Sequence, residues 1–161
     1  MRRQIIILED NAERRDHMAR ALADRLKTFE VHFFLTSKSA VEYLQKNLDE
    51  AIALSLDHDL EMVPNGDGTC SDPGDGREVA DFLSTRAPTC PVLIHSTNTI
   101  AVEGMRQVLE DADWTVHRVA PFDDMTWIST AWIRAIRDAI VRYPSSENAG
   151  SPPQVAHRSA S

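Results

Sequence analysis

The feature that most constrains the fold is a regular alternation of short apolar runs with amphipathic segments. Five runs rich in aliphatic and β-branched residues are each followed by a segment whose apolar residues recur every three or four positions. The runs cover residues 5–8, 31–35, 52–56, 91–94 and 115–119. Because buried strands alternate with helices along the chain, the sequence predicts an α/β fold with a parallel sheet covered on both faces.

The amphipathic segments predict five helices between and after these strands. Asn11 is a suitable N-cap for the first helix, and Ser37 or Ser39 for the second. The third is a short helix around residues 79–83, and the fourth follows Asn98. The expected buried residues of the first and last helices are Met18, Leu22, Leu26, Phe29, Ile128, Trp132, Ile136 and Ile140.

Length and composition fit one ordinary domain. The chain has 161 residues, 42% of them hydrophobic, and no apolar run approaches the ~20 residues of a membrane span. We expect one domain at residues 1–143 and a disordered tail at residues 144–161, where Ser, Pro and Gln dominate. The apolar run at 5–8 is too short for a signal peptide, so we expect a cytoplasmic protein without membrane contact.

Charge and cysteine usage exclude several kinds of partner. The formal net charge is −8, which argues against broad binding to duplex nucleic acid but leaves room for a small phosphate ligand in a local pocket. Cys70 and Cys90 do not form a CxxC motif, which argues against a structural zinc site or a disulfide framework.

Polar residues collect immediately after three of the predicted strands. They are Glu9 and Asp10, then Asp57, His58 and Asp59, then His95, Ser96, Thr97 and Asn98. Ligands of open parallel sheets bind outside the carboxyl ends of the strands, so these residues predict one pocket there.

The acidic residues predict a metal site. Converging carboxylates repel one another unless a cation lies between them, and oxygen ligands suit Mg²⁺ or Mn²⁺. The candidate ligands are Glu9, Asp10, Asp57 and Asp59. The alternative is that these acids are solvated strand ends or helix caps.

The histidines and the short polar side chains suggest phosphate chemistry. Histidine side chains can change protonation near neutral pH, so His95 and His58 suit general acid or base catalysis, although either can simply make a structural hydrogen bond. Side chains alternate along a strand, so Asp57 and Asp59 point the same way and His58 the other way. His58 can therefore serve as a brace, which favours His95 for catalysis. Ser96, Thr97 and Asn98 stand at a strand-to-helix turn that favours anions, or they cap the helix.

The segment at residues 64–76 contains four glycines and two prolines, which predicts a loop. We interpret it as a mobile flap beside the pocket. Its aspartates, Asp67, Asp72 and Asp75, do not have the spacing of a helix–loop–helix calcium site.

These residues resemble the receiver domain of bacterial response regulators over residues 3–143. Glu9 and Asp10 match that family's metal-binding acids, Asp57 its phosphorylated aspartate, and Ser96 its switch residue. The resemblance implies a three-layer, flavodoxin-like sandwich with a five-stranded parallel sheet in the order 2-1-3-4-5. The chain departs from the family at Ala120, where receivers have a lysine that contacts the phosphoryl group.

A narrower resemblance rests on Ser-Leu-Asp-His-Asp-Leu at 55–60, His-Ser-Thr-Asn at 95–98 and Gly-Met at 104–105. These motifs are similar to those of receiver-derived domains predicted to process cyclic phosphates. Glu9 is a departure, since the first acid of that group is usually Asp. The resemblance implies a metal-dependent phosphoesterase acting on a cyclic nucleotide or an RNA end, with a covalent phosphate on Asp57 as a variant.

Two other functions fit the same sequence. A stand-alone atypical receiver would accept phosphate or bind a protein partner without turnover, although Ala120 counts against ordinary phosphorylation. A degenerate domain would only mediate protein contacts and would show no response to metal.

Overall fold

The computed structural model describes residues 1–144, so nearly all of the expected tail at 144–161 lies outside the described residues. A five-stranded parallel sheet forms the centre of the molecule, in the order β2-β1-β3-β6-β7. Counted along this sheet, the order is the predicted 2-1-3-4-5, which is confirmed. The strands are β1 (Gln4–Leu8), β2 (Glu30–Phe34), β3 (Ala51–Leu56), β6 (Val92–Ile94) and β7 (Val116–Arg118).

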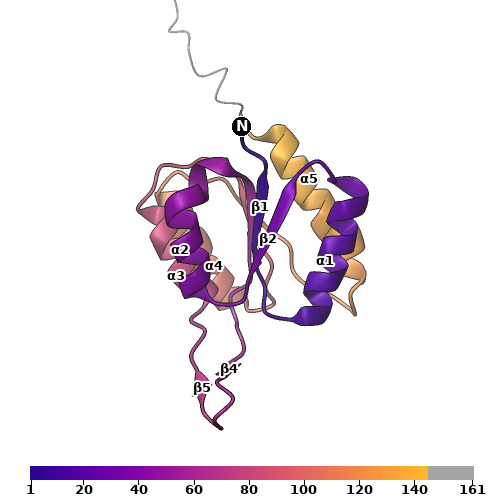
Figure 1. Ribbon diagram of the computed structural model, residues 1–161. Helices are drawn as coiled ribbons and strands as arrows, with labels where there is room; N and C mark the ends of the chain where they lie inside the picture. Colours follow the sequence, from indigo (N-terminus) through magenta and orange to yellow (C-terminus); the bar gives the residue numbers. More distant parts are fainter. Residues whose placement is uncertain (145–161) are drawn as a thin grey trace, which may run out of the picture.

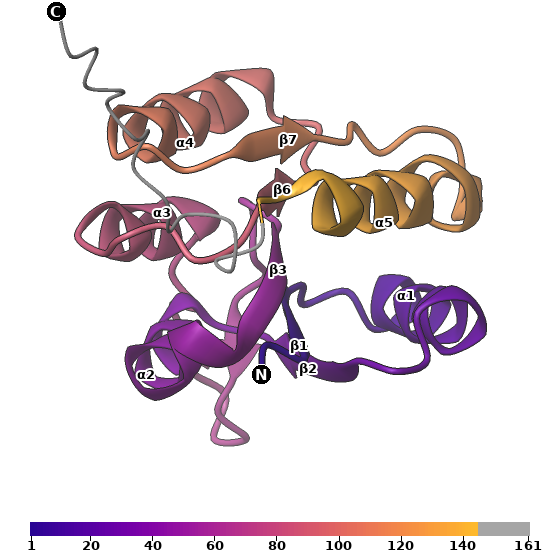
Figure 2. The same ribbon diagram turned by 90° about the horizontal axis from the view of Figure 1, so that it is seen from above.

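Helices cover both faces of the sheet, as Figures 1 and 2 show. On one face lie α2 (Ser37–Asn47), α3 (Gly76–Ser84) and α4 (Thr99–Asp111), with the short 3₁₀ turn η1 (Leu48–Glu50) after α2. The other face carries α1 (Ala12–Arg25) and α5 (Ile133–Arg142), which continues from the π-helical turn η2 (Ile128–Trp132). The predicted three-layer sandwich is therefore the observed architecture.

The core divides into two halves because successive strand residues face opposite sides of the sheet. Ile6 and Leu8 of β1 pack in the half beneath α2, α3 and α4. Ile5 and Ile7 pack in the half beneath α1 and α5, together with Trp132. The wholly apolar run at 5–8 follows from this, because β1 is buried on both faces.

The first helix is shorter than its apolar pattern suggested. The helix α1 ends at Arg25, and Leu26 is its C-cap. Phe29 lies in the connection to β2, yet it still packs against the α1–α5 half of the core. The side chain is half-buried, and it reaches the core from outside the helix.

The segment expected to be loop contains a small hairpin. Its strands β4 (Val63–Pro64) and β5 (Cys70–Ser71) pair antiparallel and project from the carboxyl edge of the sheet (Figure 1). Gly66 and Gly68 adopt φ values of +81° and +90°, which side chains disfavour, and so let the chain reverse between the strands. The prediction of a loop over residues 64–76 was therefore wrong where the strands of the hairpin and the start of α3 form.

None of the helices in residues 1–144 is long and apolar enough to cross a membrane.

Candidate active site at the carboxyl edge of the sheet

Three neighbouring strands bring Glu9, Asp57 and His95 together. Leu8 pairs with Leu56 and Leu56 with Ile94, so the next residue of each strand emerges at the same level. One potential ligand atom from each of the three side chains lies within 4.8 Å of the other two. The residues are 0%, 5% and 0% exposed, respectively. The site is therefore a consequence of strand order and register.

A hydrogen-bonded relay orients His95. The Trp132 indole N–H donates to Ser55 Oγ at 3.0 Å, and Ser55 Oγ lies 2.7 Å from His95 Nδ1. Since an indole nitrogen only donates, the Ser55 hydroxyl is free to donate its proton to Nδ1. His95 Nε2 then carries the ring proton toward Glu9 Oε2, 3.1 Å away. In this state His95 is a proton donor rather than a metal ligand.

Arg14, which the sequence interpretation did not include, lies between the two buried acids. Its guanidinium Nη1 is 3.5 Å from Glu9 Oε2 and 3.6 Å from Asp57 Oδ2, and the group stacks over Trp127 at 5.5 Å. The protein thus supplies a cation of its own to the acid pair. The available sequence signal was a basic residue one helical turn after the Asn11 cap.

The two carboxyl groups have opposite pKa shifts. Burial raises the pKa of Glu9, but His95, the Asn11 N–H and Arg14 together outweigh burial, so its pKa lies below the ordinary value. Burial, with the charge of Glu9 as a further contribution, raises the pKa of Asp57 to about 6 despite opposing contributions from His95 and Arg14. Glu9 is therefore the ionised member of the pair at acidic pH.

The other predicted residues divide between the pocket and its rim. Asp10, Asp59, Ser96 and Thr97 line a pocket of about 220 Å³ together with the acid pair. The Asp10 carboxylate accepts the backbone N–H of Glu61, which ties it to the base of the hairpin.

His58 and Asn98 are not among the pocket-lining residues of the described chain. His58 Nδ1 lies 2.7 Å from Asp59 Oδ1, and Asn98 Nδ2 lies 3.4 Å from Asp59 Oδ2. The Asn98 side chain also caps α4 by accepting the Ala101 N–H. Both residues contact Asp59, which lines the pocket, and the predicted cap by Asn98 is observed.

The residues fit a small, hard cation. Glu9 and Asp57 offer carboxylate oxygens, Asp10 lines the same pocket, and an open pocket leaves positions for water. With a proton on His95 Nε2, facing Glu9, the available ligands are all oxygens, as Mg²⁺ prefers. Any such ion would have to replace the contacts of Arg14 with both acids.

A five-stranded parallel sheet in this order, with acids gathered at its carboxyl edge, defines the receiver class of fold. Solved structures similar to this chain include the phosphorylated cyanobacterial phytochrome response regulator RcpA, at 19% identity and a TM-score of 0.66, covering 90% of this chain and 98% of that one. A response regulator receiver domain from Rhodospirillum rubrum is 17% identical, with a TM-score of 0.62, and the match covers 87% of this chain and 95% of that one. The response regulator domain of Thermotoga maritima CheB is 14% identical, with a TM-score of 0.62, and the match covers 89% of this chain and 100% of that one. These likenesses show the fold.

The family is shown by the sequence itself. Residues 4–111, more than half of the chain, match the family described as the cyclic-phosphate processing receiver domain. The chain belongs to that family. No curated protein matches it in sequence.

Proposed function

We propose that this protein is a metal-dependent phosphoesterase that opens a cyclic phosphate, carried by a nucleotide or an RNA end. The observation that carries the proposal is the convergence of Glu9, Asp57 and His95, with the Nε2 proton of His95 directed into the acid cluster. The two acids line the pocket, and His95 lies buried behind them, within hydrogen-bond distance of Glu9. Metal-binding acids with a nearby proton donor suit phosphodiester hydrolysis.

The residues have separate roles in this reaction. A divalent cation held by Glu9, Asp57 and Asp10 would polarise the phosphoryl group. Water adds to phosphorus, one ring P–O bond breaks, and the imidazolium form of His95 gives its Nε2 proton to the departing oxygen and becomes neutral imidazole, while the attacking water loses a proton to solvent. Ser96 and Thr97 line the pocket where the phosphate oxygens would lie.

The supporting residues act through those that touch the substrate. Trp132 and Ser55 orient the His95 ring, because the Ser55 hydroxyl can accept the Nδ1 proton of the imidazolium and donate to Nδ1 of the neutral ring. His58 and Asn98 hold Asp59, whose carboxylate faces the pocket.

The test is a screen of 2′,3′-cyclic and 3′,5′-cyclic nucleotides and of an RNA ending in a 2′,3′-cyclic phosphate, with Mg²⁺, with Mn²⁺ and with EDTA. We expect turnover only with metal, lowered at least about 100-fold in His95→Ala and in Asp57→Asn. His117→Ala is the matched control, because His117 is exposed on β7. Metal-dependent turnover that survives in His95→Ala would refute the assignment, as would a full screen without turnover.

Arg14 favours a second candidate function, a stand-alone receiver that is phosphorylated on Asp57. Its guanidinium lies 3.6 Å from Asp57 Oδ2 and offers a positive charge there, as the lysine replaced by Ala120 does in receivers. Such a protein would be labelled at Asp57 by a small phosphodonor such as acetyl phosphate and would not turn over any ester. Loss of labelling in Arg14→Gln, without turnover in the screen, would favour this function.

A further inference from the structure

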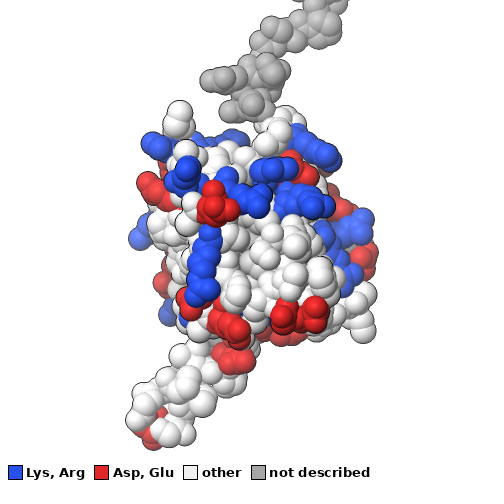
Figure 3. Space-filling model, turned by 90° about the vertical axis from the view of Figure 1, so that its right-hand side faces the viewer, with Lys and Arg blue, Asp and Glu red and all other residues white. Residues whose placement is uncertain are grey.

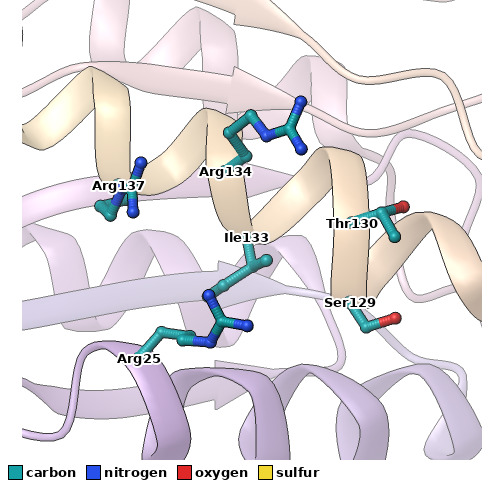
Figure 4. A pocket seen from close by; sticks show the side chains of 6 residues that line it. All are labelled: Arg25, Ser129, Thr130, Ile133, Arg134 and Arg137. Atoms are coloured by element: carbon teal, nitrogen blue, oxygen red, sulfur yellow. The ribbon is translucent and has the colours of Figure 1, made fainter.

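A second polar pocket lies on the α1–α5 face, away from the acid cluster. It is formed by Arg25 at the end of α1, Ser129 and Thr130 of η2, and Ile133, Arg134 and Arg137 of α5 (Figure 4). Its volume is about 160 Å³, and Ile133, only 6% exposed, forms an apolar floor. Figure 3 shows this side of the molecule, with Lys and Arg gathered in the half away from the hairpin and acids nearer to it.

The three guanidinium groups keep most of their hydrogen-bond donors free. Arg25 uses only Nε on Asp24, at 2.8 Å, and Arg137 contacts Asp138 through one Nη, at 3.4 Å. Both pairs join adjacent, exposed residues and are weak in water. Arg134 forms no ion pair within residues 1–144. Each guanidinium has five N–H groups, so the pocket presents a surplus of donors with positive charge.

The hydroxyl groups at the other end of the pocket have the opposite character. Ser129 and Thr130 donate their hydroxyl protons to the carbonyl of Thr126, at 3.2 Å and 2.7 Å. Their oxygens are left to act as acceptors. Both belong to the π-helical turn, a geometry that is rare and frequently found at functional sites.

We propose that this pocket binds a small phosphomonoester that also carries a free hydroxyl group. The phosphate dianion binds the guanidinium groups of Arg25, Arg134 and Arg137 through paired N–H···O bonds. The ligand hydroxyl donates to the oxygen of Ser129 or Thr130. The net charge of −8 argues against a long polyanion, whereas a small anion responds to the local cluster of positive charge. The site is independent of the hydrolysis proposed above.

Calorimetric titration in EDTA tests the site, with glycerol 3-phosphate and methyl phosphate as the two probes. Glycerol 3-phosphate should bind at a single site and methyl phosphate several-fold more weakly, because methyl phosphate has no hydroxyl to donate. Arg134→Ala should weaken glycerol 3-phosphate binding about tenfold or more, while Arg86→Ala, an exposed charge-matched control, should not. Thr130→Val should narrow the difference between the two probes.

Several results would overturn the proposal. One is the absence of saturable binding up to about 10 mM of either probe. Equal losses in Arg134→Ala and Arg86→Ala would mean attraction by overall charge alone. Equal affinity for the two probes would refute the proposed contact between the ligand hydroxyl and Ser129 or Thr130. Loss of binding in Asp57→Asn would place the anion in the other pocket. Circular dichroism of each variant checks the fold, and substitutions at exposed arginines are expected to leave it unchanged.

Discussion

Glu9 and Asp57 are two buried carboxyl groups of one site whose pKa values are shifted in opposite directions. The Glu9 carboxylate accepts hydrogen bonds from His95 Nε2 and from the Asn11 N–H. The Asp57 carboxylate accepts one hydrogen bond from a backbone N–H, that of His58. The carboxylate with more hydrogen-bond donors carries the negative charge, and this charge helps to raise the pKa of Asp57.

The raised pKa of Asp57 predicts an unusual pH dependence of stability. The folded-state pKa of about 6 exceeds the ordinary value of 3.8, so the folded state binds the proton more tightly than the unfolded state. The stabilising contribution of Asp57 to the free energy of unfolding is therefore largest below pH 4. It is lost as pH rises through 6, by up to about 3 kcal/mol. We therefore expect Asp57→Asn, measured by urea unfolding in EDTA, to be more stable than wild type at pH 7.

That advantage should be small near pH 4 and should vanish near pH 3, where Asp57 is protonated in both states. A wild-type protein that gains stability relative to the variant between pH 4 and pH 7 would contradict the prediction.

Arg14 gives a prediction about metal binding. Removing its guanidinium in Arg14→Gln leaves Glu9 and Asp57 without their internal counter-charge, so an added cation meets less competition. We expect the variant to bind Mn²⁺ about tenfold more tightly than wild type in a titration followed by electron paramagnetic resonance. Arg20→Gln, which removes an exposed charge from the same helix, should leave the affinity nearly unchanged. Weaker binding by Arg14→Gln would show that the guanidinium assists the metal.

At the scale of elements, the hairpin is attached to the site through its base rather than its tip. The Gly76 N–H donates to the His58 carbonyl, and Asp59 and Asp75 form an isolated bridge. Nearby, the Ser37 N–H donates to the Pro73 carbonyl, and the Ser37 hydroxyl donates to Glu78 Oε2 of α3 at 2.8 Å. The backbone that follows Asp57 is thereby fixed by the start of α3.

This attachment predicts different outcomes for alanine at two glycines. A Cβ on Gly76 would lie 2.1 Å from the Asp57 carbonyl oxygen, so backbone at the site must move. We expect Gly76→Ala to lower the free energy of unfolding by about 3 kcal/mol and to weaken any metal response. Gly66→Ala at the hairpin tip meets nothing within 4 Å and should cost about 1 kcal/mol, for its positive φ alone. Chemical denaturation of both variants measures the difference, and equal costs would contradict it.

At the scale of the whole molecule, the two cysteines differ in how accessible they are in the folded protein. Cys70 is exposed on the hairpin, whereas Cys90 is buried beside β6, where burial raises the pKa of its thiol to about 12. Cys90 becomes reactive only when the sheet opens.

A thiol reagent should therefore modify Cys70 at once and Cys90 at least about 1,000-fold more slowly in the native protein. Urea should accelerate the slow phase in step with global unfolding, as mass spectrometry of each cysteine can follow. Rapid labelling of Cys90 without denaturant would contradict this expectation.

The sequence by itself determined the alternation of strands and helices and the order in which polar residues leave the sheet. Both follow from local periodicity, because a run buried on both faces must be apolar and the next polar residue must stand at its end. The confirmed fold, and the placement of Glu9, Asp57 and His95 at strand ends, could therefore be predicted from the sequence.

Only the tertiary structure decided how these residues meet. The Trp132–Ser55–His95 relay, the position of Arg14 between the acids and the arginine pocket each join side chains from separate elements. The hairpin escaped the sequence interpretation because its strands are two residues long and carry no alternation. Contacts between distant segments and the low dielectric constant of their surroundings depend on which elements pack together, and no local pattern encodes that.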